Sequence, residues 1–385
     1  MRRVLIVASA AVLVDTIFFS ALAPLLPELV DTYGLSKAGA GILTAAFAIG
    51  AVAGAIPAGY FALRAGTKLT MLVGLAIVAG ATIAFAFVGN AWSLDLARFV
   101  QGVGSAFVWT GALAWILDVA PKDRRGEVVG YAFAAAIGGA LLGPLLGGAA
   151  SVVGLRATFG AVAVIIGVLA VVVYLTPTPP PSKRQSLWAL ARAVRDAGVR
   201  RGLYLLILPG LLLGVITVLA PLELSRLGWS AVAIAGVFFV SAVMNMVASP
   251  LVGRWSDRRG RIEPVWVALA MSGAAVLVLP WVDVTIVLAI VVALAAVSFG
   301  LFAVPGAAIL SDATERAGIE MGLGVALMNL AWSPGDALGA AASGVLADLG
   351  GDTLAYGVVA VIIAVTAIWF GTSTRSGRAE PTGTS

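Results

Sequence analysis

The chain has 385 residues, of which 61% are hydrophobic and 11% charged, with a formal net charge of +5 and neither cysteine nor histidine. Because soluble domains carry about 25% charged residues, a chain this apolar must expose apolar side chains to lipid. The missing residue types exclude disulfides, thiolate chemistry, histidine-bound metals and histidine proton relays.

Continuous apolar runs of about 20 residues predict transmembrane helices rather than the short alternating strands of a barrel. We expect twelve spans, at 4–25, 38–62, 69–89, 93–118, 127–150, 157–176, 203–222, 231–252, 264–281, 285–310, 320–345 and 354–372. The predicted fold class is therefore an all-α integral membrane protein. The first run resembles a signal peptide, but it contains Asp15 and lacks a clear cleavage site, so we expect a retained span.

Basic residues between the runs predict the orientation. Of the 24 Lys and Arg residues, only Lys37, Arg98, Arg156 and Arg226 fall on or towards the side opposite the N-terminus. By the positive-inside rule, both termini are cytoplasmic in a multi-pass protein of the cell membrane. Because the basic residues are spread over short loops, the net charge does not indicate a nucleic-acid partner.

Asp15 is expected near the middle of the first span, about 16 Å from the inner edge of a hydrocarbon layer about 30 Å thick. An ionised carboxylate there costs at least about 2.5 kcal/mol, so it needs a partner, a wet cavity or a proton. We interpret Asp15 as a proton- or cation-binding residue; the alternative is a permanent pair with Arg98. Phe18 and Phe19 are candidate cavity residues, although aromatic side chains in spans often only pack.

Arg98 lies within the fourth span, where an arginine is costly and usually functional. We expect it about 8 Å inside the outer edge, so it could instead snorkel to the surface or pair with Asp95 one turn away. Gln101 follows it by three residues, and Trp109 in the same span is a further candidate for the cavity.

The fifth span carries glycines at set spacing around one proline. They are Gly130, Gly139, Gly143, Pro144, Gly147 and Gly148. Such a set would arise by chance in this composition with odds of about one in a thousand or less. Glycines allow another helix to approach closely, and Pro144 bends the helix; ordinary packing of small residues is the same mechanism.

The longest internal break, 177–202, begins Thr-Pro-Thr-Pro-Pro-Pro, a stiff extended spacer. Apolar residues then recur at helical spacing, which predicts a short helix on the inner leaflet. We therefore divide the chain into an N-terminal bundle (1–176), a cytoplasmic linker (177–202), a C-terminal bundle (203–372) and a cytoplasmic tail (373–385).

The two halves repeat with an offset of 194 residues. The segment 59–66 after the second span corresponds to 253–260 after the eighth, and Asp118 corresponds to Asp312. A duplicated six-helix unit is common in secondary transporters, with the substrate site between the halves near the bilayer midplane.

The loop after the eighth span reads Gly253-Arg-Trp-Ser-Asp257-Arg258-Arg259-Gly260-Arg261. Its acid and arginines can pair with one another and with Asp312. Such a cluster would hold one conformation closed and break in the other. The alternative is a merely basic inside loop.

The corresponding loop of the first half is degenerate. Leu63 and Thr67 stand where an acid and an arginine are expected. This leaves Arg64 and Lys68 as the groups that could still reach Asp118.

Asp336 in the eleventh span is a second deep acid, directly after Pro334-Gly335. A Pro-Gly break beside an acid indicates a kink that lines a cavity; the alternative is an acid at a loop end. Asn245, Asn329 and Trp332 are further candidates, and each asparagine could equally join two helices.

Together these segments resemble the major facilitator superfamily and, within it, the twelve-span drug:proton antiporters. The resemblance covers nearly the whole chain. The loop at 253–261 is similar to G-x-L-x-D-R-x-G-R with Trp for Leu, residues 98–104 to R-x-x-Q-G-x-G, the glycines at 130–148 to G-x8-G-x3-G-P-x2-G-G, and Asp15, Pro24 and Pro27 to D-x8-P-x-x-P.

The resemblance implies two pseudo-symmetric six-helix bundles, a monomer and no cofactor. It assigns proton coupling to Arg98 with Gln101, exchange of proton and substrate charge to Asp15, and a sliding helix interface to 130–148. The acid and arginines after the eighth span would form an inner latch with Asp312.

We expect a transporter that exchanges protons for small lipophilic or cationic compounds across the bilayer. No Gly-x4-Gly-Lys-[Ser/Thr] phosphate loop is visible, which points to an ion gradient as the energy source. The alternatives are an uncoupled facilitator or a proton symporter that imports a solute. A receptor or a membrane enzyme is more remote, since scattered acids without His or Cys offer no catalytic set.

Overall fold

The computed structural model describes residues 1–121, 124–177, 194–318 and 321–376, which are almost entirely helical. The first half contains α1 (Arg2–Ser20), α2 (Leu22–Tyr33), α3 (Lys37–Ala65), α4 (Thr67–Phe87), α5 (Ala91–Val119), α6 (Arg125–Val153) and α7 (Leu155–Leu175). The second half contains α9 (Ala197–Arg226), α10 (Ala231–Arg259), α11 (Ile262–Val278), the 3-10 helix η2 (Leu279–Trp281), α12 (Thr285–Leu301), α13 (Ala303–Arg316) and α14 (Met321–Ser376). This architecture confirms the predicted all-α membrane fold.

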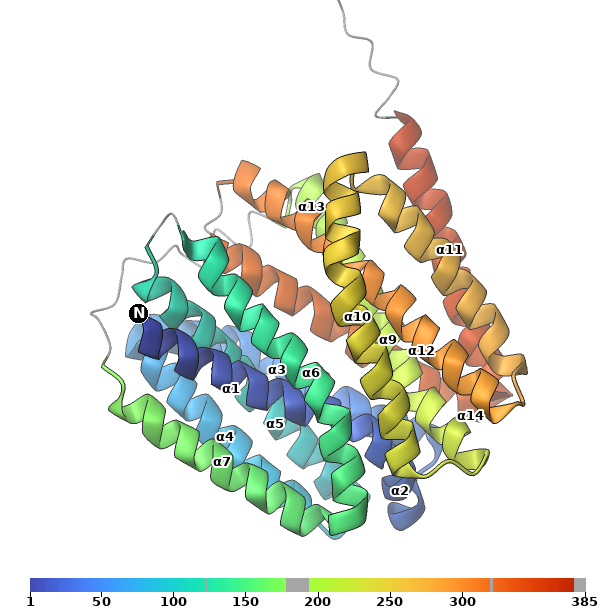
Figure 1. Cartoon of the computed structure of the whole chain (residues 1–385), viewed down its shortest axis with the longest axis horizontal. Helices are drawn as coiled ribbons and strands as arrows, with labels where there is room; N and C mark the ends of the chain where they lie inside the picture. Colours follow the sequence, from blue (N-terminus) through green and yellow to red (C-terminus); the bar gives the residue numbers. More distant parts are fainter. Residues whose placement is uncertain (122–123, 178–193, 319–320, 377–385) are drawn as a thin grey trace, which may run out of the picture.

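The helices form two groups that lean against each other (Figure 1). The blue-to-green helices α1 to α7 occupy one side of the view, and the yellow-to-red helices α9 to α14 occupy most of the other. Helix α2 reaches across to α9 and α10, and α3 packs along α14. We call the face where α1 begins the terminal face, and the face where α3 begins the opposite face.

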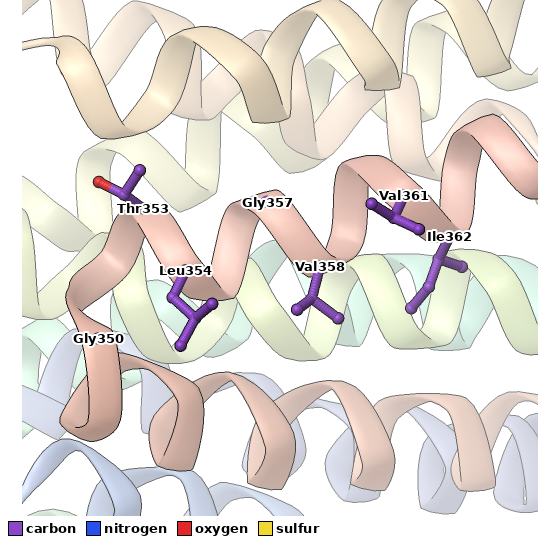
Figure 2. A pocket seen from close by; sticks show the side chains of 7 residues that line it. All are labelled: Gly350, Thr353, Leu354, Gly357, Val358, Val361 and Ile362. Carbon is purple, nitrogen blue, oxygen red and sulfur yellow. The ribbon is translucent and has the colours of Figure 1, made fainter.

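The eleventh and twelfth spans form one continuous element. Eleven helices in the described ranges are long and apolar enough to cross a membrane, and one of them covers 42 residues, from Leu330 to Gly371. It reverses at Gly350 and Gly351, where the backbone leaves helical geometry, and Figure 2 shows Gly350 at this bend. The φ of 76° at Gly351 is a conformation that glycine adopts readily. The eleven candidates therefore contain the twelve predicted spans.

The first span is longer than expected and is broken in its middle. It continues through α2 to Tyr33, with the break at Ala21. Proline lacks an N–H and its ring clashes with the carbonyl four residues earlier, so Pro24 cannot continue the ladder from Ser20. The tenth span breaks at Phe302 for the same reason, because Pro305 follows Leu301 by four residues.

The seventh span begins earlier than expected, at Ala197 instead of residue 203. The side chain of Asp196 caps it by accepting a hydrogen bond from the backbone N of Val199 at 3.0 Å. A carboxylate at a helix N-terminus also offsets the positive end of the helix dipole. The predicted inner-leaflet helix falls mostly on residues 178–193, which lie outside the described residues.

Candidate substrate and proton site

Asp15 is buried inside the N-terminal half, with 4% of its surface exposed. Its Oδ2 accepts a hydrogen bond from Ser105 Oγ at 2.6 Å and another from Trp109 Nε1 at 3.0 Å. Its Oδ1 is buried without a hydrogen-bond partner in the described structure. One carboxylate oxygen of Asp15 is therefore hydrogen-bonded, and the other could still bind a proton or a ligand.

Helix α5 presents a polar stripe to this acid. Arg98, Gln101, Ser105 and Trp109 follow one another at spacings of three or four residues, so they share one helix face. The sequence reasoning did not single out Ser105. The signal that would have found it is this spacing, which places a hydroxyl one turn from both Gln101 and Trp109.

The side chain of Arg98 is more fully buried inside the protein than expected. It is 2% exposed, which contradicts an arginine that snorkels to the rim or pairs there with Asp95. Its Nη1 donates to Gln101 Oε1 at 3.2 Å, and its guanidinium lies 4.9 Å from the centroid of the Phe47 ring. A cation over an aromatic face is stabilised by the ring's quadrupole, which compensates part of the lost hydration.

Arg98 contacts neither deep acid directly. Among the described residues, no ion pair within 4 Å joins it to Asp15 or to Asp336. Its charge nevertheless interacts with both carboxylates, one from each half of the molecule. This arrangement does not match the alternative of a permanent Asp15–Arg98 pair.

Glycines hold α5 close to its neighbours and so keep Arg98 buried. A Cβ on Gly102 would clash with the carbonyl oxygen of Phe47 and lie 2.8 Å from the backbone N of Ala51, both on α3. A Cβ on Gly104 would lie 2.8 Å from the Val78 side chain of α4. The glycines beside Arg98 and Gln101 are therefore required by helix packing.

Asp336 is buried inside α14 at 3% exposure, and its Oδ2 has no hydrogen-bond partner in the described structure. Pro334 and Gly335 do not interrupt the helix, because the backbone of α14 leaves helical geometry only at Gly350 and Gly351; the predicted kink stays a prediction. The loop-end alternative is wrong, since Asp336 lies within the helix. Gly335 instead allows close packing on α9, where an added Cβ would lie 2.9 Å from the backbone N of Leu211.

Eight buried side-chain polar atoms lack a hydrogen-bond partner among the described residues, and three of them belong to the deep charged residues: Asp15 Oδ1, Arg98 Nε and Asp336 Oδ2. Each such group costs about 1–3 kcal/mol when it stays unsatisfied. Two acids and one base from both halves form a polar centre in an otherwise apolar interior. A proton could bind to either carboxylate oxygen, and water or a charged ligand could form hydrogen bonds with any of the three atoms.

The aromatic candidates have different surroundings. Phe18 is 2% exposed and packs edge-on against Phe159, with centroids 5.1 Å apart, so it belongs to the hydrophobic core. Phe19 is half-buried and lies 5.1 Å from Phe47, the ring beneath Arg98. Trp109 contacts the acid directly, as described above.

The candidates of the second half do not gather around one point. Asn245 on α10 donates to the carbonyl oxygen of Ala296 on α12 at 3.1 Å, so it joins two helices. The side chain of Asn329 lies outside the described residues. Trp332 is half-buried, and its backbone carbonyl contacts Gly210 of α9.

The glycines of α6 face mainly α1 and α2. A Cβ on Gly139 would lie 2.7 Å from Thr16 Cβ, one on Gly143 would lie 2.5 Å from Ser20 Cβ, and one on Gly147 would clash with the Ala21 carbonyl. Pro144 lies within the same helix. Gly148 faces α10 of the other half, where an added Cβ would lie 2.9 Å from Ala235 Cβ, whereas Gly130 has open space around it.

The loop after α10 contains an ion pair within the C-terminal half. Arg261 Nη2 donates to Asp312 Oδ1 at 3.0 Å, and Nη1 also pairs with Oδ2. Asp257 and Arg258 are exposed. The turn at Gly260 has a φ of 88°, whereas Gly253 lies inside α10.

The first half repeats this contact with a different residue. Thr67, which stands where the arginine is expected, donates from Oγ1 to Asp118 Oδ2 at 3.2 Å. Lys68 instead donates to the carbonyl oxygens of Tyr174 and Thr176 at 2.7 and 2.8 Å. Arg64 lies 4.4 Å from the ring of Tyr60.

An open groove of about 650 Å³ lies on the second arm of α14 (Figure 2). It is lined by Gly350, Thr353, Leu354, Gly357, Val358, Val361 and Ile362, none of which is charged. None of the predicted site residues contributes to it. We therefore place the candidate site at the polar centre and not at this groove.

Residues 8–335 match the sequence model of the Major Facilitator Superfamily. The chain belongs to this superfamily. The transporter is similar to an uncharacterized MFS-type transporter of Schizosaccharomyces pombe, with 32% identity over 163 residues, covering 40% of this chain and 36% of that one. It is also similar to the quinolone resistance protein NorA of Staphylococcus aureus, with 31% identity over 157 residues and 40% of each chain. The matches thus span less than half of the length of these relatives.

Solved structures match the transporter over nearly its whole length. A D-xylose–proton symporter superposes with a TM-score of 0.75 at 17% identity, covering 96% of each chain. A bacterial homologue of the human lysosomal transporter Spinster, inward-facing and occupied, superposes with a TM-score of 0.78 at 17% identity, covering 97% of this chain and 96% of that one. At this identity the likeness shows the fold, which is the two-bundle fold.

Proposed function

We propose that this transporter exports small lipophilic or cationic compounds in exchange for protons, by alternating access around the polar centre. The observation that carries the proposal is Asp15: a carboxyl group deep in the first span, held by Ser105 and Trp109 through one oxygen only. Its other oxygen is free to take a proton or to face the positive charge of a substrate.

Exchange follows from competition at this oxygen. A protonated carboxyl is neutral and offers little attraction to a cation, while a bound cation stabilises the ionised form against protonation. Each ligand therefore lowers the affinity for the other, and by linkage the effect is reciprocal. The halves would rock about this centre and present it to each side in turn.

Arg98 and Asp336 complete the proposed site. Arg98 supplies the positive charge that stabilises an ionised Asp15, and Gln101 orients its guanidinium. Asp336 adds an acid from the C-terminal half to the same electrostatic centre. With both acids ionised the three groups carry a net charge of minus one, which favours neutral or cationic cargo over anions.

The relatives support the direction of transport only by analogy. The similarity to a protein named for quinolone resistance agrees with export of drug-like compounds. Both termini remain assigned to the cytoplasm on the basis of charge alone. With that orientation, the opposite face is the extracellular one.

The deciding experiment uses purified protein in liposomes with an imposed pH gradient and a panel of lipophilic cations. We expect Asp15→Asn to accumulate normally in the membrane but to lose proton-driven transport, because the amide cannot exchange a proton. Asp31→Asn, an exposed acid at the end of α2, serves as the matched control and should transport normally.

Unchanged pH-dependent transport by Asp15→Asn would refute the coupling role. Transport by the unmodified protein that ignores a collapsed pH gradient would favour the uncoupled facilitator. Substrate uptake together with protons, in the same direction, would favour the symporter.

A further inference from the structure

On the opposite face, Asp348 of the C-terminal half caps the N-terminus of α3 in the N-terminal half. Asp348 of α14 accepts hydrogen bonds from the backbone N of Lys37 at 3.1 Å and of Ala38 at 2.9 Å, the first two residues of α3. Lys37 Nζ in turn forms an ion pair with Asp352 Oδ1 at 2.5 Å. Carboxylate bonds to free N–H groups at a helix N-terminus are charge-assisted and favoured by the helix dipole.

Helix α3 also has a cap within its own half, from Ser36, whose side chain in addition donates a hydrogen bond to Asp348. The side chain of Ser36 accepts a hydrogen bond from the backbone N of Gly39 at 3.2 Å. In the repeat, Ser230 caps α10 in the same way through Ala233 at 3.3 Å. The carboxylate from α14 is therefore an addition that joins two halves, and its loss leaves the ordinary cap in place.

Beneath these charges the two helices touch backbone to backbone. A Cβ on Gly41 of α3 would clash with the carbonyl oxygen of Ala340. A Cβ on Gly344 of α14 would lie 3.1 Å from the Cα of Ala38. This close approach brings the end of α3 within reach of the acids of α14, and it exists only while the halves are together on this face.

Among the described residues, the matching seam on the same face, between α6 and α10, shows no such charged contact. Gly148 meets Val232 and Ala235 there. With the repeat offset of 194 residues, Lys37 corresponds to Ala231 and Asp348 to Gly154. The charged contact is thus a feature of one seam and not a general consequence of the duplicated fold.

Further charges surround the contact and complete its electrostatic environment. Glu223 on α9 interacts with the charge of Lys37, and Arg226 on α9 interacts with Asp352 and with Asp283 of the loop before α12. Around this contact, in the described part of the chain, Lys37 and Arg226 thus face four acids (Glu223, Asp283, Asp348 and Asp352), and Arg226 is itself ion-paired with Glu223. Loss of the positive charge of Lys37 would leave Asp348 and Asp352 facing other acids.

We propose that Lys37, Asp348 and Asp352 form a reversible latch that holds the opposite face closed, and that the latch must release before the transporter opens there. On opening, water replaces Asp348 at the N-terminus of α3, so the helix itself remains intact. The capping contact of Asp348 is of a kind that can change a two-state equilibrium about tenfold, and the more exposed Lys37–Asp352 pair adds a smaller factor. The inference goes beyond the proposed function, because it needs neither proton coupling nor a particular substrate.

The absence of cysteine from the chain allows a direct test. Spin labels at Trp92→Cys in the N-terminal half and Trp281→Cys in the C-terminal half sit on side chains that are 73% and 72% exposed. Pulsed EPR in lipid nanodiscs then measures the distance between the halves on this face. We expect Asp348→Asn to raise the ratio of long to short distances about tenfold, and Asp31→Asn to leave it unchanged.

Charge exchange separates a latch from general damage to the fold. Lys37→Asp and Asp352→Lys alone should each favour long distances, whereas the double variant should return towards the unmodified distribution. Distance distributions that stay unchanged in Asp348→Asn and in both single charge variants would overturn the proposal. So would a double variant that opens this face as far as the single variants do. Because the readout is a distance, either result is independent of whether Asp15 couples transport to protons.

Discussion

Asp15 differs from an ordinary buried carboxylate in one oxygen atom, Oδ1, which has no hydrogen-bond partner in the described core. Ser105 and Trp109 both donate to Oδ2 of Asp15, and Oδ1 is left without a partner in the described core. The sequence predicted a costly acid at this depth and Trp109 as a cavity candidate. It did not predict Ser105, because serine is common in spans and only the shared helix face places this hydroxyl against α1.

We expect Ser105→Ala to lower the rate of proton-driven transport about tenfold to a hundredfold, since removal of a hydrogen bond to a charged group costs about 1.5–3 kcal/mol. Initial rates in liposomes measure the effect, and Ser105→Thr, which keeps the hydroxyl, should restore most of the rate. Equal rates for Ser105→Ala and the unmodified protein would show that this bond does not support the site.

At the scale of the helices, small residues decide which elements touch. The glycine pattern of α6 predicted a close helix approach, and the structure identifies the partner as α1 and α2. The pattern could not separate Gly130, which has open space around it, from Gly143, which is pressed against Ser20. A glycine in the sequence looks the same in both cases, because the neighbour comes from a distant segment.

The two positions form a matched pair for mutation. Gly143→Leu should abolish transport, because the side chain would wedge α6 away from α1, and overpacking of this kind costs about 1–3 kcal/mol or more. Gly130→Leu should transport at nearly the normal rate. The comparison is made from initial rates at equal amounts of folded protein, and a normal rate for Gly143→Leu would contradict the interface.

At the scale of the whole molecule, both halves contain a contact to the acid at equivalent positions, but it is an ion pair in one half and a neutral hydroxyl's hydrogen bond in the other. Arg261 pairs with Asp312, and 194 residues earlier Thr67 bonds to Asp118. The Arg261 and Asp312 side chains are 32% and 51% exposed, so solvent screens their attraction. Such pairs are typically worth about 0.2–1 kcal/mol, close to the net value of one neutral hydrogen bond.

We therefore expect Arg261→Met and Thr67→Val to lower the melting temperature in detergent by similar, small amounts. Both variants remove one contact to the acid that closes the fourth or tenth span, without removing the acid itself. A loss several times larger for Arg261→Met would show that the arginine stabilises more than this exposed pair, for example a contact made only in another conformation.

The sequence by itself determined the membrane environment, the number of spans and the duplication, because each follows from local composition or fixed spacing along the chain, and its motifs resembled those of the superfamily. It also predicted two deep acids. Only the tertiary structure decided that Arg98 lies in the interior, that Pro334 does not break its helix and that Asp348 caps α3. These depend on which helices pack together, and packing between segments that are distant in the sequence, up to 311 residues apart for Lys37 and Asp348, has no local signature in the chain.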